Sequence, residues 1–120
     1  MSAVRAWARI HAVMRIGLGA FLAFEALMFL AHRPGLFARL GYSEGARVAL
    51  GACEAAAAIL MIFPATFEAG AVGLIAVLAW AAGFHFGLHE RAASLFVDMA
   101  LVGLLLASRR SAAAPREADA

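Results

Sequence analysis

The chain has 120 residues, of which 65% are hydrophobic and only 15% charged, and its mean hydropathy is +0.87. Soluble domains are about half apolar and about a quarter charged, so this composition argues against a soluble domain. All ten basic residues are Arg, and they lie at segment ends and in loops without forming a basic run with interleaved aromatic residues. We therefore expect the chain to contact a lipid bilayer and no nucleic acid.

Four hydrophobic segments follow one another along the chain. They cover roughly residues 12–31, 45–63, 69–88 and 92–107. A helix needs about 20 apolar residues to cross the hydrocarbon core, so each segment is a candidate span. The second and third connections are short, which predicts antiparallel neighbouring helices. The sequence predicts an all-α protein: one integral membrane four-helix transmembrane bundle over residues 1–107, then a disordered polar tail over 108–120.

Turn and packing signals support these boundaries. The second segment stops at Pro64, and Thr66 is placed to cap the helix that follows. Gly83 and Gly87 in the third segment have the GxxxG spacing that allows close helix contact in membranes. The sequence thus predicts a tight turn after the second helix and a close approach near the end of the third.

The arginines predict an orientation. If the termini share one side, that side holds Arg5, Arg9, Arg15, Arg109, Arg110 and Arg116, and the opposite loops hold Arg33, Arg39, Arg47 and Arg91. Loops rich in basic residues remain in the cytoplasm. We therefore expect a multi-pass protein with cytoplasmic termini.

Each hydrophobic segment carries one ionisable residue well inside it: Glu25, Glu54, His85 and Asp98. A charge in the hydrocarbon interior costs at least a few kcal/mol, so such residues usually mark relays or ligand sites. A helix rises about 1.5 Å per residue, which places all four groups in the half of the bilayer nearest the first and third connections. We interpret them as candidates for ligand binding or proton relay, facing inward and hydrogen-bonded to one another. The alternative is that they are structural hydrogen bonds between helices.

Metal and electron-transfer chemistry have little support in the sequence. His85 and His89 are four residues apart and are the candidates for metal ligands, but this spacing is common and we expect no metal. The single cysteine, Cys53, excludes an intrachain disulfide. The chain has no CxxC motif, no cluster-ligand spacing and no flavin motif. We do not expect an enzyme in its own right, and catalytic residues stay unassigned.

Three stretches resemble the DoxX and DoxX-like family of small four-helix membrane proteins. Arg15 opens an apolar, Gly-containing helix, as in that family. The stretch Leu50-Gly51-Ala52-Cys53-Glu54 resembles the family's Gly-x-x-Glu helix, which ends at a proline, here Pro64. The segment from Gly73 to His85 resembles its third helix, with small residues and a late His. The resemblance covers roughly residues 12–107.

The resemblance implies a location and a class of partner. Named members are subunits of a thiosulfate:quinone oxidoreductase or partners of redox enzymes, so it implies a bacterial inner-membrane protein that works with a redox partner and a quinone. Glu54 is the site residue that the resemblance carries over. The family often has Gly-x-x-Lys at the end of its first helix, whereas this chain has Glu25 in that region, so the resemblance does not carry a mechanism over directly.

Three functions stay open from the sequence. The first is a subunit or accessory of a membrane redox system, whose buried polar pocket binds quinone or relays protons. The second is a small permease that works as a homo-oligomer, because four helices rarely enclose a pathway alone. The third is a purely structural or assembly subunit.

Overall fold

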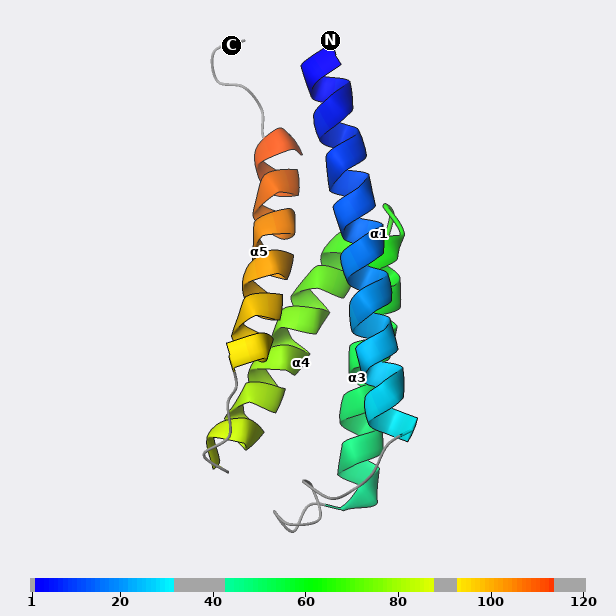
Figure 1. Cartoon of the computed structure of the whole chain (residues 1–120), viewed down its shortest axis with the longest axis vertical. Helices are drawn as coiled ribbons and strands as arrows, with labels where there is room; N and C mark the ends of the chain where they lie inside the picture. Colours follow the sequence, from blue (N-terminus) through cyan, green and yellow to red (C-terminus); the bar gives the residue numbers. More distant parts are fainter. Residues whose placement is uncertain (1, 32–42, 88–92, 114–120) are drawn as a thin grey trace.

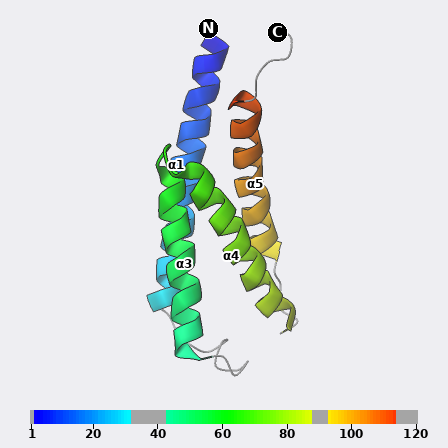
Figure 2. The ribbon, with the colours of Figure 1, turned by 180° about the vertical axis from the view of Figure 1, so that it is seen from behind.

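The computed structural model describes residues 2–31, 43–87 and 93–113, and helices take up most of these residues (Figure 1). They are α1 (Ser2–Ala31), α3 (Glu44–Ile62), α4 (Phe67–Gly87) and α5 (Ala93–Ala113). The described residues contain no strand, so the all-α prediction is confirmed. Consecutive helices run antiparallel, and the start of α1 and the end of α5 lie at the same end of the molecule (Figure 2).

The helices are arranged in a row that is only partly closed. α1 packs on α3, α3 on α4, and α4 on α5, whereas α1 and α5 touch sparsely. α4 crosses the molecule diagonally, and the first part of α1 and the last part of α5 extend past the turn between α3 and α4 (Figure 1). The extended ends of α1 and α5 therefore stand beside each other without a third helix between them.

One apolar core takes side chains from all four helices. Leu22, Met61, Leu74, Leu78 and Val102 are fully buried within it. The outer surface is apolar as well, and large side chains on α1, α3, α4 and α5 point outward. Soluble monomers rarely expose such extended apolar surface, whereas a lipid-facing helix requires it.

Two of the described helices, α1 and α3, are long and apolar enough to cross a membrane. The described apolar part of α4 is shorter, Phe67–Gly83. α5 carries Asp98, Arg109 and Arg110, which lower its hydropathy. Length and composition thus support two of the four predicted spans.

Two helices extend beyond the segments predicted from hydropathy. α1 begins at Ser2, and α5 continues to Ala113, so residues 108–113 are helical where a disordered tail was predicted. Contacts with the start of α4 explain the longer α5. The Arg109 guanidinium lies 5.0 Å from the centroid of the Phe67 ring, and Arg110 forms an ion pair with Glu68 at 3.6 Å. Residues 114–120 lie outside the described part.

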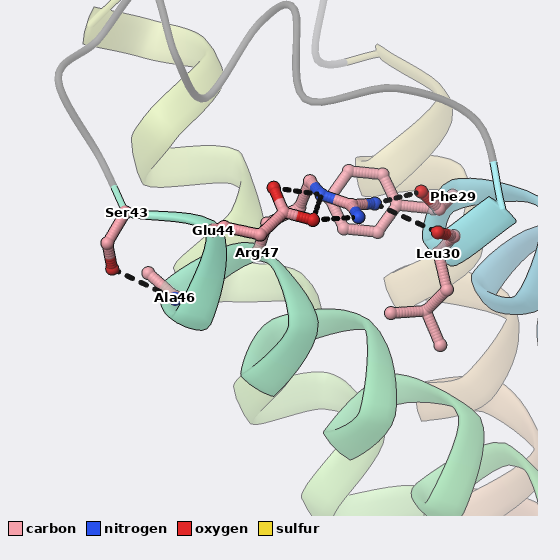
Figure 3. A network of polar contacts seen from close by, with 6 residues as sticks. All are labelled: Phe29, Leu30, Ser43, Glu44, Ala46 and Arg47. Carbon is pink, nitrogen blue, oxygen red and sulfur yellow. Dashed lines mark hydrogen bonds and ion pairs between the residues drawn. The ribbon is translucent and has the colours of Figure 1, made fainter.

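Two arginines cap the C-terminal ends of α1 and α3 reciprocally. Arg15 Nε donates a hydrogen bond of 2.9 Å to the carbonyl oxygen of Ile62, the last residue of α3. Arg47 Nη1 donates to the carbonyl oxygens of Phe29 at 2.7 Å and Leu30 at 3.1 Å, in the last turn of α1 (Figure 3). The last carbonyls of a helix have no partner within it, so these bonds satisfy them and fix the register of the pair.

The first turn of α3 positions Arg47. Ser43 has an extended backbone, and its Oγ accepts a hydrogen bond of 3.2 Å from the amide of Ala46, as a helix N-cap does. Glu44 forms an ion pair with the Arg47 guanidinium (Figure 3). Arg47 is buried, whereas the Glu44 side chain is 58% exposed. Glu44 therefore holds the Arg47 guanidinium in the orientation in which its Nη1 reaches the carbonyls of α1.

The turn between α3 and α4 is closed by Thr66. Phe63 is extended because Pro64 follows it, and α3 ends there. Thr66 precedes α4 as predicted, but its hydroxyl donates to the carbonyl oxygen of Leu60 at 2.7 Å instead of accepting from an amide of α4. Its backbone oxygen accepts the amide of Gly70 at 2.9 Å. Thr66 thus links the end of one helix to the start of the next.

We expect Thr66→Val to lower the free energy of unfolding by about 1 kcal/mol, because it removes one hydrogen bond and keeps the shape of the side chain. Thermal unfolding in mild detergent measures this change. Thr66→Ser keeps the hydroxyl and serves as the control. Equal stability of the valine and serine variants would contradict the role of the hydroxyl.

The closest helix approach occurs at Gly70 and not at the predicted GxxxG pair. A Cβ at Gly70 would lie 2.7 Å from the carbonyl oxygen of Ala57 and 2.8 Å from the carbonyl carbon of Leu60. A Cβ at Gly83 would meet nothing within 4 Å. The prediction of close contact at Gly83 is wrong for the described residues, because α4 diverges from α3 along its diagonal course (Figure 2).

Candidate functional site

Three of the four predicted site residues gather in one region of the bundle. Glu25 lies on α1, Glu54 on α3 and Asp98 on α5. The Glu54 carboxyl is near enough to those of Glu25 and Asp98 to feel their charges, and Glu25 feels Asp98 in turn. Three different helices therefore bring together three carboxyl groups, which we call the acidic cluster.

Burial differs across the acidic cluster. Glu25 is exposed on the outside of α1, Glu54 is half-buried, and Asp98 is buried with 8% of its surface exposed. Leu95 and Met99, the neighbours of Asp98 on α5, pack against the core. The three carboxyls thus range from the outer face of the bundle to its interior.

The carboxyls of the acidic cluster lack protein partners in the part of the chain that the structure describes. No hydrogen bond or ion pair there joins Glu25, Glu54 or Asp98 to one another or to a third residue. The expected mutual hydrogen bonds are therefore not made. Arg47 binds Glu44 and carbonyls of α1, and Arg15 binds the carbonyl of Ile62, so neither pairs with the cluster. The charges of the cluster are electrostatically coupled but are not neutralised by these arginines.

The structure does not place the fourth predicted member. His85 belongs to α4, but its side chain and the whole of His89 lie outside the described residues. Among the described residues, no group of three or more His, Cys, Asp or Glu could hold a metal ion. The metal candidates His85 and His89 are not tested by this geometry and stay predictions.

Two adjoining cavities lie at the other end of the bundle, where α1 and α5 extend past the α3–α4 turn. One, of about 260 Å³, is mainly apolar and is lined by residues that include Ile10, Met14, Leu101 and Leu104. The other, of about 300 Å³, includes Arg15, Pro64 and Arg109. Both share Trp7, His11 and Ser108. None of the three acids lines either cavity.

Sequence reasoning missed these cavities because it began the first span too late, at residue 12, and ended the fourth span too early, at residue 107. His11 Nε2 lies 3.1 Å from the carbonyl oxygen of Leu105, and the His11 ring meets the Phe67 ring edge-on at 5.4 Å between centroids. The available signal was the spacing of Trp7, His11 and Arg15, which recur every four residues just before and at the start of the first apolar segment. Trp7 and His11 fall outside the predicted first span and Arg15 lies near its start, so the hydropathy pattern alone gave them no common site.

Comparison with protein families gives a single assignment. The sequence matches the DoxX-like family over residues 13–108, which is most of the chain. The chain belongs to the DoxX-like family. This confirms the resemblance found in the sequence and, at the family level, supports a membrane protein. The range that matches the DoxX-like family includes Glu25, Glu54 and Asp98 but leaves out Trp7 and Arg109. No curated protein and no solved structure gives a significant match.

Proposed function

We propose that this DoxX-like protein is a multi-pass inner-membrane subunit that relays protons for a membrane redox partner. The acidic cluster of Glu25, Glu54 and Asp98 carries the proposal. Three helices contribute carboxyls that feel one another's charge and have no ion-pair partner among the described residues. Such a cluster would be neutralised by bound protons and not by a positively charged side chain.

The physical argument starts from the cost of burying charge. An ionised carboxylate in an apolar environment is unfavourable, and nearby like charges add to that cost. A cluster of this kind favours protonated carboxyls, and bridging water would carry protons from one member to the next. Helix-joining hydrogen bonds would hold those protons in place, and the described residues show none at the three acids. A relay role therefore fits the geometry better than a role as structural hydrogen bonds.

The bilayer location rests on two further observations. Val13, Phe24 and Val97 are each more than half exposed on the outside of the helices, as lipid-facing residues are. α1 and α3 have the length and composition of spans. The arginines of α1 and the end of α5 share one end of the bundle (Figure 1), and we place that end in the cytoplasm by the positive-inside rule.

A redox partner is part of the proposal because the chain carries no electron-transfer motif of its own. Reduction of a quinone consumes protons as well as electrons. In this proposal the partner supplies the electrons and the acidic cluster passes the protons. Whether the quinone contacts this chain or only the partner is decided by extracting the purified protein and identifying bound lipids by mass spectrometry.

We expect Glu54→Gln to reduce the chain's contribution to quinone reduction at least about tenfold, because positioned proton transfer typically contributes more than that. The measurement is donor-dependent reduction of a soluble quinone by membranes from cells in which the variant replaces the native protein. The melting temperature of the purified variant is measured in parallel.

Glu68→Gln is the matched control, because Glu68 is an exposed carboxylate outside the acidic cluster. Full activity of Glu54→Gln would contradict the relay, as would an equal loss in Glu68→Gln. Unchanged quinone reduction in cells lacking the protein would contradict the redox role itself. A variant with lowered stability and normal activity would favour the structural subunit.

One observation favours a second candidate, the oligomeric permease. Glu25 is exposed on the outer face of α1, where lipid would otherwise surround it. A second copy of the chain would shield this carboxyl and extend the polar region across an interface. A strictly monomeric protein in mild detergent would exclude this candidate and leave the relay.

A further inference from the structure

The two cavities between the extended ends of α1 and α5 form one amphipathic groove. We call it the α1–α5 groove; Trp7, His11 and Ser108 are shared by its two parts. One part is lined mainly by apolar side chains such as Ile10 and Leu104. The other part is cationic, because Arg15 and Arg109 line it. A ligand that fills both parts needs an apolar portion and an anionic portion.

An unsatisfied donor lies in the cationic part. Arg109 Nη1 is buried and has no hydrogen-bond partner among the described residues. The guanidinium stacks over the Phe67 ring, and His11 contacts the same ring edge-on. A buried N–H without a partner costs free energy, and a small shift of the guanidinium toward the cavity that Arg109 lines would let a phosphate oxygen satisfy this N–H with a charge-assisted bond. The ring contacts keep the guanidinium at the wall of that cavity.

The charges around the groove leave a positive excess. Arg5 and Arg9 lie on the same end of α1 as Arg15. Glu68 is the carboxylate near this end of the described helices, and Arg110 pairs with it. Arg15 uses Nε for the carbonyl of Ile62. An anion is therefore the complementary ligand.

The position of the groove in the bilayer indicates that the anion is the headgroup of a lipid. α3 contains 19 residues, or roughly 28 Å of helix, which is close to the thickness of the hydrocarbon core. The α3–α4 turn then lies at the headgroup level, and Pro64 of that turn lines the cationic part. Arg15, which binds the end of α3, lies at the same level. The cationic part of the groove thus lies at the level of the lipid headgroups.

We propose that the α1–α5 groove is a specific binding site for an anionic phospholipid. Its phosphate binds Arg109 and Arg15, and an acyl chain lies along Met14, Leu101 and Leu104, which continue from the cationic part toward the hydrocarbon core. The proposal is independent of the acidic cluster, because no member of the cluster lines the groove. It adds a regulatory or anchoring ligand at the end of the bundle opposite the acids.

Trp7 provides a reporter for the experiment. Trp7 lines both parts of the groove, and replacing Trp80 by Phe leaves Trp7 as the single tryptophan of the full chain. The protein is reconstituted in phosphatidylcholine vesicles that contain a minor fraction of brominated phosphatidylglycerol or of brominated phosphatidylcholine. We expect brominated phosphatidylglycerol to quench Trp7 with an apparent affinity about fivefold higher, which corresponds to the contribution of about one Arg near a membrane surface.

Variants separate the groove from general surface charge. We expect Arg109→Gln to abolish the preference for phosphatidylglycerol and Arg5→Gln to keep it, because Arg5 lies at the same end but lines neither cavity. Ala8→Phe places a ring in the cationic part from an exposed position. It should abolish the preference without disturbing the core, which keeps the test valid if Arg109→Gln unfolds.

Four outcomes would overturn the proposal. The first is equal quenching of Trp7 by both lipids in the native sequence. The second is an equal loss of preference in Arg5→Gln, which would assign the effect to surface charge. The third is a Trp7 that neither lipid quenches, which would mean that protein, such as a second copy of the chain, covers the groove. Inorganic phosphate added to the vesicles should leave the quenching unchanged, and competition by it would indicate a free anion as the ligand.

Discussion

We expect Gly70→Ala to be the most destabilising small substitution in this protein, lowering the free energy of unfolding by about 3 kcal/mol or preventing folding. A methyl group at this position would lie 2.7 Å from the carbonyl oxygen of Ala57 and 2.8 Å from the carbonyl carbon of Leu60, and closer still to the amide nitrogen of Met61. All three are backbone atoms of α3, so no side chain can rotate away. Accommodation requires α3 and α4 to separate.

The matched control for Gly70→Ala lies one helical turn further along α4. A Cβ at Gly73 would meet its nearest neighbour, the Cβ of Ala57, at 3.6 Å, which is an ordinary van der Waals contact. Alanine also has a higher helix propensity than glycine. Gly73→Ala should therefore melt at the same temperature as the native chain or above it. Thermal unfolding of both variants in the same detergent decides the matter, and similar melting temperatures would contradict the close approach at Gly70.

Separation of the helices would affect more than the turn. Met61 and Phe67 are fully buried near the α3–α4 turn and belong to the shared core. Moving α4 outward would expose both side chains and loosen the contact of Phe67 with Arg109 and His11. We therefore expect Gly70→Ala to disturb the α1–α5 groove as well, whereas Gly73→Ala should preserve it.

The sequence predicts the number, type and order of the described helices because apolar length and turn residues determine them locally. Pro64 marks the end of α3, and Thr66 marks the start of α4, within one or two residues of the structure. The sequence fails where a helix continues into polar residues. The extension of α5 through Arg109 and Arg110 depends on Phe67 and Glu68, which are distant in sequence, so hydropathy gives no sign of it.

In the candidate site, too, the sequence determines some features, whereas others depend on how the helices pack. Depth along antiparallel helices predicts that the ionisable residues lie at one level, and the structure places Glu25, Glu54 and Asp98 within electrostatic range of one another. Rotation about each helix axis is not determined by depth, so the inward orientation predicted for these residues holds for Asp98, which is buried, and is wrong for Glu25, which is exposed. The capping role of Arg47 was missed for a related reason. A basic residue near a helix end usually indicates a membrane flank, and only the register of two helices identifies the carbonyls it binds.

Arg47 leads to the second large effect: we expect Arg47→Met to lower the melting temperature by roughly 5–10 °C. Methionine keeps most of the apolar length but has no donor, so the carbonyl oxygens of Phe29 and Leu30 lose their partner at the end of α1 (Figure 3). The Arg47 guanidinium also lies 5.8 Å from the centroid of the Phe29 ring, and that contact is lost as well. Thermal unfolding in mild detergent measures the combined effect.

Two further variants separate the hydrogen bonds to the carbonyls from the ion pair. Glu44→Gln removes the charge partner but leaves Arg47 in reach of α1, and because Glu44 is mostly exposed, we expect little change in melting temperature. Arg47→Lys keeps the charge but loses the planar guanidinium, whose Nη1 donates to both carbonyls while Nε and Nη2 bind Glu44, so its melting temperature should fall between those of the native chain and Arg47→Met. If Glu44→Gln were as unstable as Arg47→Met, the ion pair would be the stabilising contact, and the reciprocal capping of α1 and α3 would not explain their register.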